Sequence, residues 1–125
     1  MNYKVYSFVL ASILLAACSS MSAVQPTPTL DAIQQQGRAV YNLRCAQCHA
    51  LEPNTVVIGP SLAGVATRAA SRVPGYDAET YIEHSILFPR EYIVEGFGET
   101  MPTNFGKELT SDELNAVISF LMTLK

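Results

Sequence analysis

The chain has 125 residues, of which 49% are hydrophobic, and this length suits one domain with an appendage. Eleven acidic and eight basic side chains give a formal net charge of −3 and an isoelectric point near 5.2. Because binding to a phosphate backbone depends on positive charge, this balance excludes nucleic acid as an expected partner.

Residues 1–17 are predicted to be a signal peptide. Lys4 supplies a positive start, and residues 5–16 form a mainly apolar run, shorter than the ~20 residues that a spanning helix needs. The run ends in Leu-Ala-Ala-Cys at residues 15–18, which resembles a bacterial lipobox. That resemblance implies cleavage before Cys18 and lipid attachment to its thiol. The alternative is an ordinary secretory signal with an incidental cysteine.

The lipidated Cys18 and the residues up to 30 are predicted to form a flexible tether, because the segment is polar, contains two prolines and shows no periodicity. A folded domain then occupies residues 31–125. With a lipid on Cys18, this domain is expected at the periplasmic or extracytoplasmic face of a bacterial cell membrane.

The folded part is expected to be all-α, with three to four short helices. Asp31 is a good N-cap for a first helix that runs toward residue 45. Thr110 and Glu113 form a capping box for the last helix. A further helix is expected at residues 77–87, ended by Pro89. Residues 50–74 are mostly loop, with a short helix around residues 61–70.

The periodicity of the apolar residues predicts which faces of these helices are buried. Gly37 lies mid-helix, where glycine costs ~1 kcal/mol relative to Ala, so we expect another helix to approach it closely. The expected inward positions are Ile33, Gly37, Val40 and Arg44 with Tyr41 and Leu43 beside them in the first helix, Tyr81, Ile82, Ser85 and Ile86 in the third, and Leu114, Val117, Ile118, Leu121 and Leu124 in the last.

The chemistry is concentrated in residues 45–49, Cys-Ala-Gln-Cys-His, which form the attachment pattern of a c-type haem. The thiols of Cys45 and Cys48 can each add to one porphyrin vinyl group, and His49 is then held against the iron as an axial ligand. Zinc needs two more Cys or His ligands at suitable spacing, and a redox dithiol should follow a strand. The sequence therefore predicts one covalent haem rather than either alternative.

Iron held by one histidine leaves a sixth position, for which Met101 is the preferred ligand. Met101 lies in a loop just before the last helix, and Pro102 stiffens the chain after it. Met21 lies in the tether and Met122 in the last helix, while His84, the other histidine, lies within a predicted helix. An open or water-bound iron is the remaining alternative.

From residue 31 to its end, the chain resembles a monohaem class I cytochrome c. Gly37, Tyr41 and Cys45 follow one another at four-residue steps, as do the glycine, aromatic residue and first cysteine of that family's opening helix. Phe120 matches the aromatic residue of the closing helix. The resemblance implies a fold in which the N- and C-terminal helices cross and short helices wrap around the haem.

Residues 58–62, Ile-Gly-Pro-Ser-Leu, resemble the family's segment after the haem motif. The resemblance implies that the carbonyl of Pro60 orients the ring of His49 and that Leu62 packs on the haem. It also implies one-electron transfer with His49 and Met101 as metal ligands. With both axial positions filled, no enzymatic activity and no small-molecule substrate are expected.

Residues 85–89, 92–97 and 101–102 resemble the small cytochrome c domains of membrane respiratory complexes. These include a domain fused to subunit II of some haem-copper oxidases and the monohaem lipoprotein subunit of alternative complex III, which oxidises quinol. With the lipobox at Cys18, the resemblance favours a subunit of a quinol-oxidising respiratory or photosynthetic complex. The alternatives are a tethered shuttle to a terminal oxidase or reaction centre, and a haem sensor if Met101 is not a ligand.

Acidic side chains are unevenly placed along the chain. Residues 77–113 contain nine acids against Arg90 and Lys107, whereas residues 31–76 contain two acids and four arginines. The acidic segment is consistent either with a docking face for a basic partner or with an ordinary solvated surface.

Overall fold

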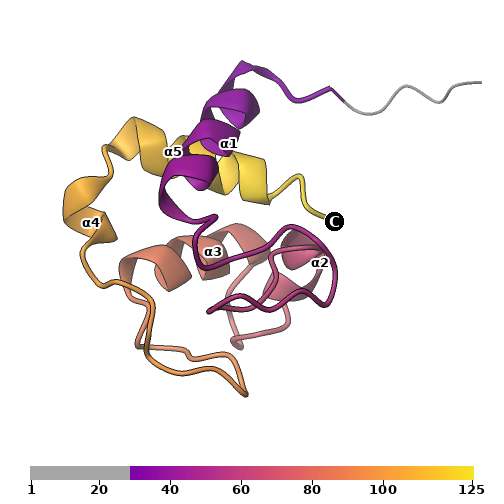
Figure 1. Cartoon of the computed structure of the whole chain (residues 1–125), viewed down its shortest axis with the longest axis vertical. Coiled ribbons are helices and arrows are strands. Elements are labelled where there is room, and N and C mark those ends of the chain that lie inside the picture. The colour runs from indigo at the N-terminus through magenta and orange to yellow at the C-terminus, as the bar shows by residue number, and fades with distance from the viewer. Residues whose placement is uncertain (1–28) are drawn as a thin grey trace, which may run out of the picture.

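The computed structural model describes residues 29–125, which form five helices and no sheet (Figure 1). The predicted signal peptide, Cys18 and nearly all of the predicted tether lie outside the described residues. Within residues 29–125, no helix has the length and apolar character needed to cross a membrane. The helices are α1 Ala32–Arg44, α2 Val65–Ala69, α3 Ala78–Leu87, α4 Phe105–Glu108 and α5 Ser111–Leu121.

The predicted helix starts are confirmed by their capping contacts. The Asp31 side chain accepts a hydrogen bond from the backbone N–H of Gln34 at 2.8 Å, and the Gln34 side chain completes a capping box. Thr110 and Glu113 form the expected capping box of α5, in which the N–H of Glu113 donates to the Thr110 hydroxyl at 3.2 Å. The Asp77 side chain caps α3 by accepting a hydrogen bond from the N–H of Thr80 at 2.8 Å. Each cap satisfies N–H groups that the first turn of a helix leaves without partners.

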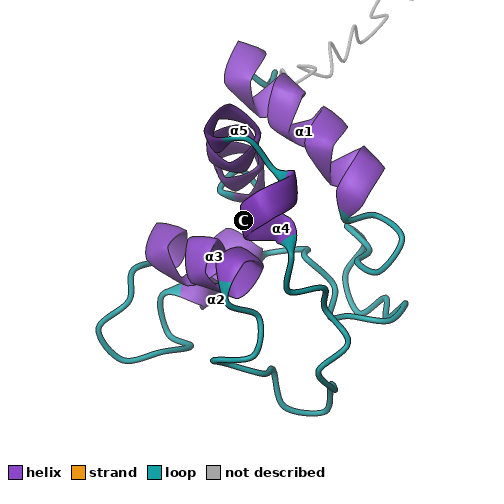
Figure 2. Cartoon of the chain, turned by 90° about the vertical axis from the view of Figure 1, so that its left-hand side faces the viewer, coloured by secondary structure: helices purple, strands orange, loops and turns teal. Residues whose placement is uncertain are grey.

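Helices α1 and α5 cross at Gly37, as the mid-helix glycine predicted. A Cβ at this position would overlap the backbone carbonyl of Ala116 and lie 2.8 Å from the Cβ of Phe120. Phe120 is 3% exposed, and its ring centroid lies 5.7 Å from that of Tyr41. The family's expected contact between opening and closing helices is therefore present (Figure 2).

The other predicted faces are mostly confirmed, with three errors in α1. Ile33 and Arg44, expected on the inward stripe, are both exposed, and so is Leu43, expected beside it, at 67%. Crossed helices touch over a limited length, so positions near the ends of α1 project beyond α5. The core contains residues from every helix: Val40, Tyr41, Val65, Ala69, Tyr81, Ile82, Ile86, Phe105, Val117, Ile118, Phe120 and Leu121.

Helix α4 was not predicted, and the predicted end of the last apolar stripe lies outside a helix. Four residues are too few to show a helical period, yet Phe105 of α4 is buried in the core. Leu124 follows the end of α5, where its carbonyl accepts a hydrogen bond from the N–H of Ala66 at 3.0 Å. This contact joins the end of the chain to α2.

Replacing Gly37 with alanine tests the crossing. Because the added methyl group meets backbone rather than a movable side chain, Gly37→Ala should lower the free energy of unfolding of the haem-loaded protein by about 1–3 kcal/mol. Gly106→Ala in α4 is the control, since its Cβ would lie at an ordinary 3.5 Å from Leu87. Denaturant unfolding measures both, and equal stability of the Gly37 variant and the parent would refute the contact.

Candidate cofactor site

A cavity of about 420 Å³ lies between α3 and the loops that follow α1 and α3. Its volume is in the range of cofactor sites, and its walls are mainly apolar. All the residues predicted to hold or contact the haem line this one cavity, namely Cys45, Cys48, His49, Pro60, Leu62 and Met101. They come from segments up to 56 residues apart, between Cys45 and Met101, that the helix packing brings together.

The turn after α1 places both thiols and the imidazole in the cavity. The N–H groups of Cys48 and His49 both donate to the carbonyl of Cys45, each at 3.0 Å. The hydroxyl of Tyr41, one turn earlier in α1, donates to the carbonyl of His49 at 2.6 Å. Tyr41 is 4% exposed, so a core side chain fixes the backbone of the motif directly.

The ring of His49 is held by the loop that follows the motif. Its Nδ1 lies 2.8 Å from the carbonyl oxygen of Pro60, the contact that the family resemblance implied. A carbonyl can only accept a hydrogen bond, so Nδ1 carries the proton and Nε2 keeps a lone pair for a metal. A Cβ on Gly59 would lie 2.5 Å from the ring's Cε1, so any side chain at this position would displace the imidazole.

The environment of the two thiols argues against the zinc and dithiol alternatives. Burial, with a further contribution from Cys48, raises the pKa of the Cys45 thiol to about 11. A catalytic dithiol needs a thiol of lowered pKa, and the motif here follows a helix rather than a strand. Among the described residues, no group of three or more Cys, His, Asp or Glu side chains is arranged to hold a metal ion.

The candidates for the sixth ligand are separated by their positions. Met101 lines the cavity that His49 also lines, whereas Met122 and His84 do not. The Nδ1 of His84 lies 3.3 Å from the hydroxyl of Tyr76 and 3.5 Å from a carboxylate oxygen of Glu91. His84 is thus engaged on the other side of α3, and Met21 lies outside the described residues.

Four arginines line the cavity, Arg44, Arg68, Arg72 and Arg90, and the sequence interpretation placed none of them there. The guanidinium of Arg68 donates to the carbonyls of Ser61 and Ala63, and burial, then Arg72, lowers its pKa. Cations in an apolar wall suit a cofactor that also carries carboxylates. For Arg68 and Arg72, the only sequence signal was their spacing of four residues in a segment expected to be mostly loop.

These features fit a porphyrin with two carboxylate side chains. Two thiols stand beside an imidazole with a free Nε2, a thioether lines the same cavity, and the remaining wall is mainly apolar with arginine side chains in it. No zinc or dithiol chemistry requires that combination. The fold and the site define an all-α protein that binds haem covalently.

Comparison with known proteins identifies the family. The family model described as Cytochrome c matches residues 34–125, and the chain belongs to the cytochrome c family. A domain of this family with a Cys-X-X-Cys-His motif carries one covalent haem c, and cytochromes c are electron-transfer proteins.

Individual relatives agree with this assignment. The chain is 32% identical over 62 residues to cytochrome c type-1 of Ascaris suum, covering 49% of this chain and 55% of that protein. It is 30% identical over 88 residues to cytochrome c2 iso-2 of Magnetospirillum molischianum, covering 65% and 91%. The match thus spans little more than half of the nematode protein and most of the bacterial one.

A solved cytochrome c from Rhodothermus marinus has a similar fold. It superposes with a TM-score of 0.55 at 26% identity, and the match covers 80% of this chain and 89% of that one. An engineered form of the Rhodothermus marinus protein gives the same TM-score at 27% identity. The predicted all-α cytochrome c fold is confirmed, with five helices in residues 29–125 rather than three to four.

Gly59 provides a test of how His49 is held. Gly59→Ala should push the imidazole away from the carbonyl of Pro60, which lowers the yield of haem-loaded protein and its unfolding free energy by about 1–3 kcal/mol. Gly98→Ala is the matched control, because Gly98 lines the same cavity but its Cβ would lie 3.9 Å from Thr100. Equal yields and stabilities for the two variants would contradict the contact.

Proposed function

We propose that the chain is a one-electron carrier whose haem iron is bound by His49 and Met101. The observation that carries this proposal is the shared cavity: an imidazole with its Nε2 free and a methionine thioether line the same apolar space as both thiols. When bound, the haem supplies the reversible one-electron chemistry of its iron. The protein contributes the ligands, their orientation and the surrounding electrostatics.

The protein's own residues determine whether the reduction potential of the haem is raised or lowered. Methionine ligation by Met101 raises the potential relative to a second histidine. The apolar walls raise it further, because they disfavour the additional positive charge of the oxidised iron. The hydrogen bond from His49 to Pro60 acts in the opposite sense by making the imidazole more basic.

Exchanging the sixth ligand tests this proposal. Met101→His should keep a six-coordinate haem but lower its reduction potential, which a spectroscopic redox titration measures. Met122→Leu is the control, since Met122 does not line the cavity and its loss should leave the potential unchanged. An unchanged potential in the Met101 variant would exclude Met101 as the ligand.

The haem-sensor alternative is tested by adding carbon monoxide to the reduced parent protein at neutral pH. An electron carrier with both axial positions filled should bind carbon monoxide slowly and incompletely, because Met101 would occupy the position that an outside ligand needs. Rapid and complete binding would favour the sensor.

We further propose that the carrier is a lipoprotein at the periplasmic or extracytoplasmic face of the bacterial cell membrane, serving a quinol-oxidising respiratory or photosynthetic complex. The support is the lipobox-like Leu-Ala-Ala-Cys ending at Cys18 and the resemblance of residues 85–102 to the cytochrome c domains of respiratory complexes. A shuttle that serves a terminal oxidase or reaction centre would have the same anchor and the same haem.

Replacing the predicted lipid-bearing residue tests the anchor. Cys18→Ser should move the haem-loaded protein from the membrane fraction to the soluble fraction, because no acyl chains can be attached, while Ser20→Ala should remain with membranes. Haem absorbance in the two fractions measures the distribution. A Cys18 variant that stays in the membrane after washing with salt would contradict lipid anchoring.

Mild solubilisation of the parent membranes then separates subunit from shuttle. A subunit should co-purify with its complex, whereas a protein that runs alone would be a shuttle.

A further inference from the structure

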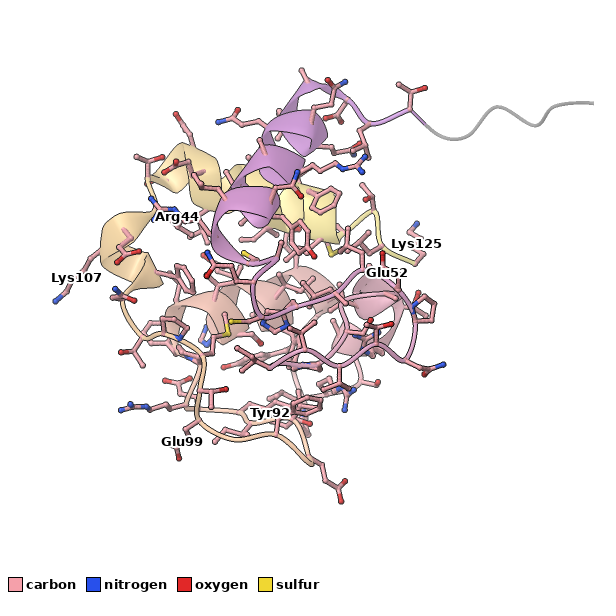
Figure 3. The ribbon with its side chains drawn as sticks, in the orientation of Figure 1. Arg44, Glu52, Tyr92, Glu99, Lys107 and Lys125 are labelled. Atoms are coloured by element: carbon pink, nitrogen blue, oxygen red, sulfur yellow. The ribbon has the colours of Figure 1, made fainter. Side chains whose placement is uncertain are left out.

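A second cavity, of about 150 Å³, lies between α3 and the loops that precede and follow it. It is too small for a second porphyrin, but it has room for a group of a few non-hydrogen atoms. Figure 3 shows Tyr92, one of its wall residues, in the lower part of the view, at the opposite end of the molecule from the start of α1. Most of the wall is aromatic, and the five rings are those of Tyr76, Tyr81, His84, Phe88 and Tyr92.

These rings are inclined to one another rather than stacked flat. The ring centroids of Tyr76 and His84 lie 4.9 Å apart at an interplanar angle of 58°, and those of Tyr81 and Tyr92 lie 5.7 Å apart at 75°. Phe88 is 49% exposed, with its centroid 5.3 Å from that of His84. The faces of aromatic rings carry partial negative charge, so a hollow bounded by several inclined rings attracts cations.

A carboxylate also lines the second cavity, that of Glu91. It is 63% exposed, and one of its oxygens lies 3.5 Å from Nδ1 of His84. Among the described residues, no lysine or arginine lines this cavity. Glu91 belongs to the 77–113 segment, in which nine acids stand against two basic residues. The charges at the second cavity therefore favour a cation over an anion.

The second cavity and the haem cavity share a wall but not their full lining. Tyr81 and Tyr92 line both cavities, whereas Phe88 and Glu91 line only the second. The proposed carrier function gives no role to the exposed ring of Phe88 or to the carboxylate beside it. Substitutions of these two residues also leave the lining of the haem cavity unchanged.

We propose that the second cavity binds an organic cation of the quaternary ammonium class, such as a trimethylammonium group. The methyl groups of such a cation can be buried against aromatic rings, while its charge is attracted by their faces and by Glu91. A primary ammonium is strongly hydrated and would lose more hydrogen bonds to water on entering an aromatic hollow. A metal ion is not suited, because no group of three or more Cys, His, Asp or Glu side chains is gathered in residues 29–125.

Calorimetric titration of the haem-loaded protein with choline tests the proposal. The matched neutral ligand is 3,3-dimethyl-1-butanol, in which carbon replaces the quaternary nitrogen. At pH 8, histidine side chains carry little positive charge that would compete with the ligand. Choline should bind roughly tenfold more tightly than the neutral analogue, because only the cation interacts with the ring faces and the carboxylate. Equal affinities, or no saturable binding of choline, would overturn the proposal.

Variants assign the binding to the second cavity. Phe88→Leu keeps an apolar side chain but removes a ring, and Glu91→Gln keeps the shape but removes a charge. Each should weaken choline binding about threefold, and the double variant roughly tenfold. Phe88→Tyr and Glu95→Gln are the controls and should bind like the parent, since the first keeps the ring and Glu95 is an exposed acid outside both cavities. Equal losses in the Glu91 and Glu95 variants, or none in the double variant, would refute the site.

A second set of measurements separates this site from the haem and identifies the source of the cation. The haem spectrum and potential of the double variant should match those of the parent; a changed spectrum would mean a disturbed haem site and would count against the proposal. Phosphatidylcholine vesicles are added to the Cys18→Ser protein, which lacks the predicted anchor. Vesicle binding that the double variant loses would assign the cavity to a lipid headgroup, whereas choline binding without vesicle binding would assign it to a small soluble cation.

Discussion

The close crossing of α1 and α5 at Gly37 is the contact on which the rest of the structure depends. Without a side chain at Gly37, the carbonyl of Ala116 and the Cβ of Phe120 can approach α1 directly. The ring of Phe120 then packs on Tyr41, and the hydroxyl of Tyr41 donates to the carbonyl of His49. The packing of the first and last helices is thus connected through one buried tyrosine to the backbone of His49, the proposed iron ligand.

The two proposed axial ligands lie outside the helices. His49 follows α1 and Met101 precedes α4. The packed helices therefore bring two loops that are far apart in the sequence to the same cavity. The loop after the motif is fixed by hydrogen bonds to Cys48 and by the contact of Pro60 with His49. This arrangement fixes the orientation of the imidazole independently of Met101.

Local signals in the sequence predicted much of this, and errors arose where burial depends on distant segments. The caps at Asp31 and Thr110 and the motif at residues 45–49 depend on neighbours within a few positions, so they could be recognised directly. The exposure of Ile33 and Leu43 depends on where α5 crosses α1.

In the candidate site too, features set by neighbouring residues could be predicted and features set by distant segments could not. The ligand candidates were recognisable as residue types, and the contact of His49 with Pro60 followed from the family resemblance. The close approach of Gly59 to the imidazole, and the placing of Arg68 and Arg72 in the cavity wall, arise only when the loop folds back. No periodic pattern encodes such contacts.

The central claim is that His49 and Met101 are the two axial ligands of the haem iron in a one-electron carrier. A redox titration of the full-length haem-loaded protein, followed by visible and near-infrared spectra, tests it most directly. The account predicts one reversible one-electron step at a potential typical of histidine–methionine ligation, with the charge-transfer band of methionine bound to oxidised iron. A high-spin spectrum, or a bis-histidine spectrum at a low potential, would contradict it.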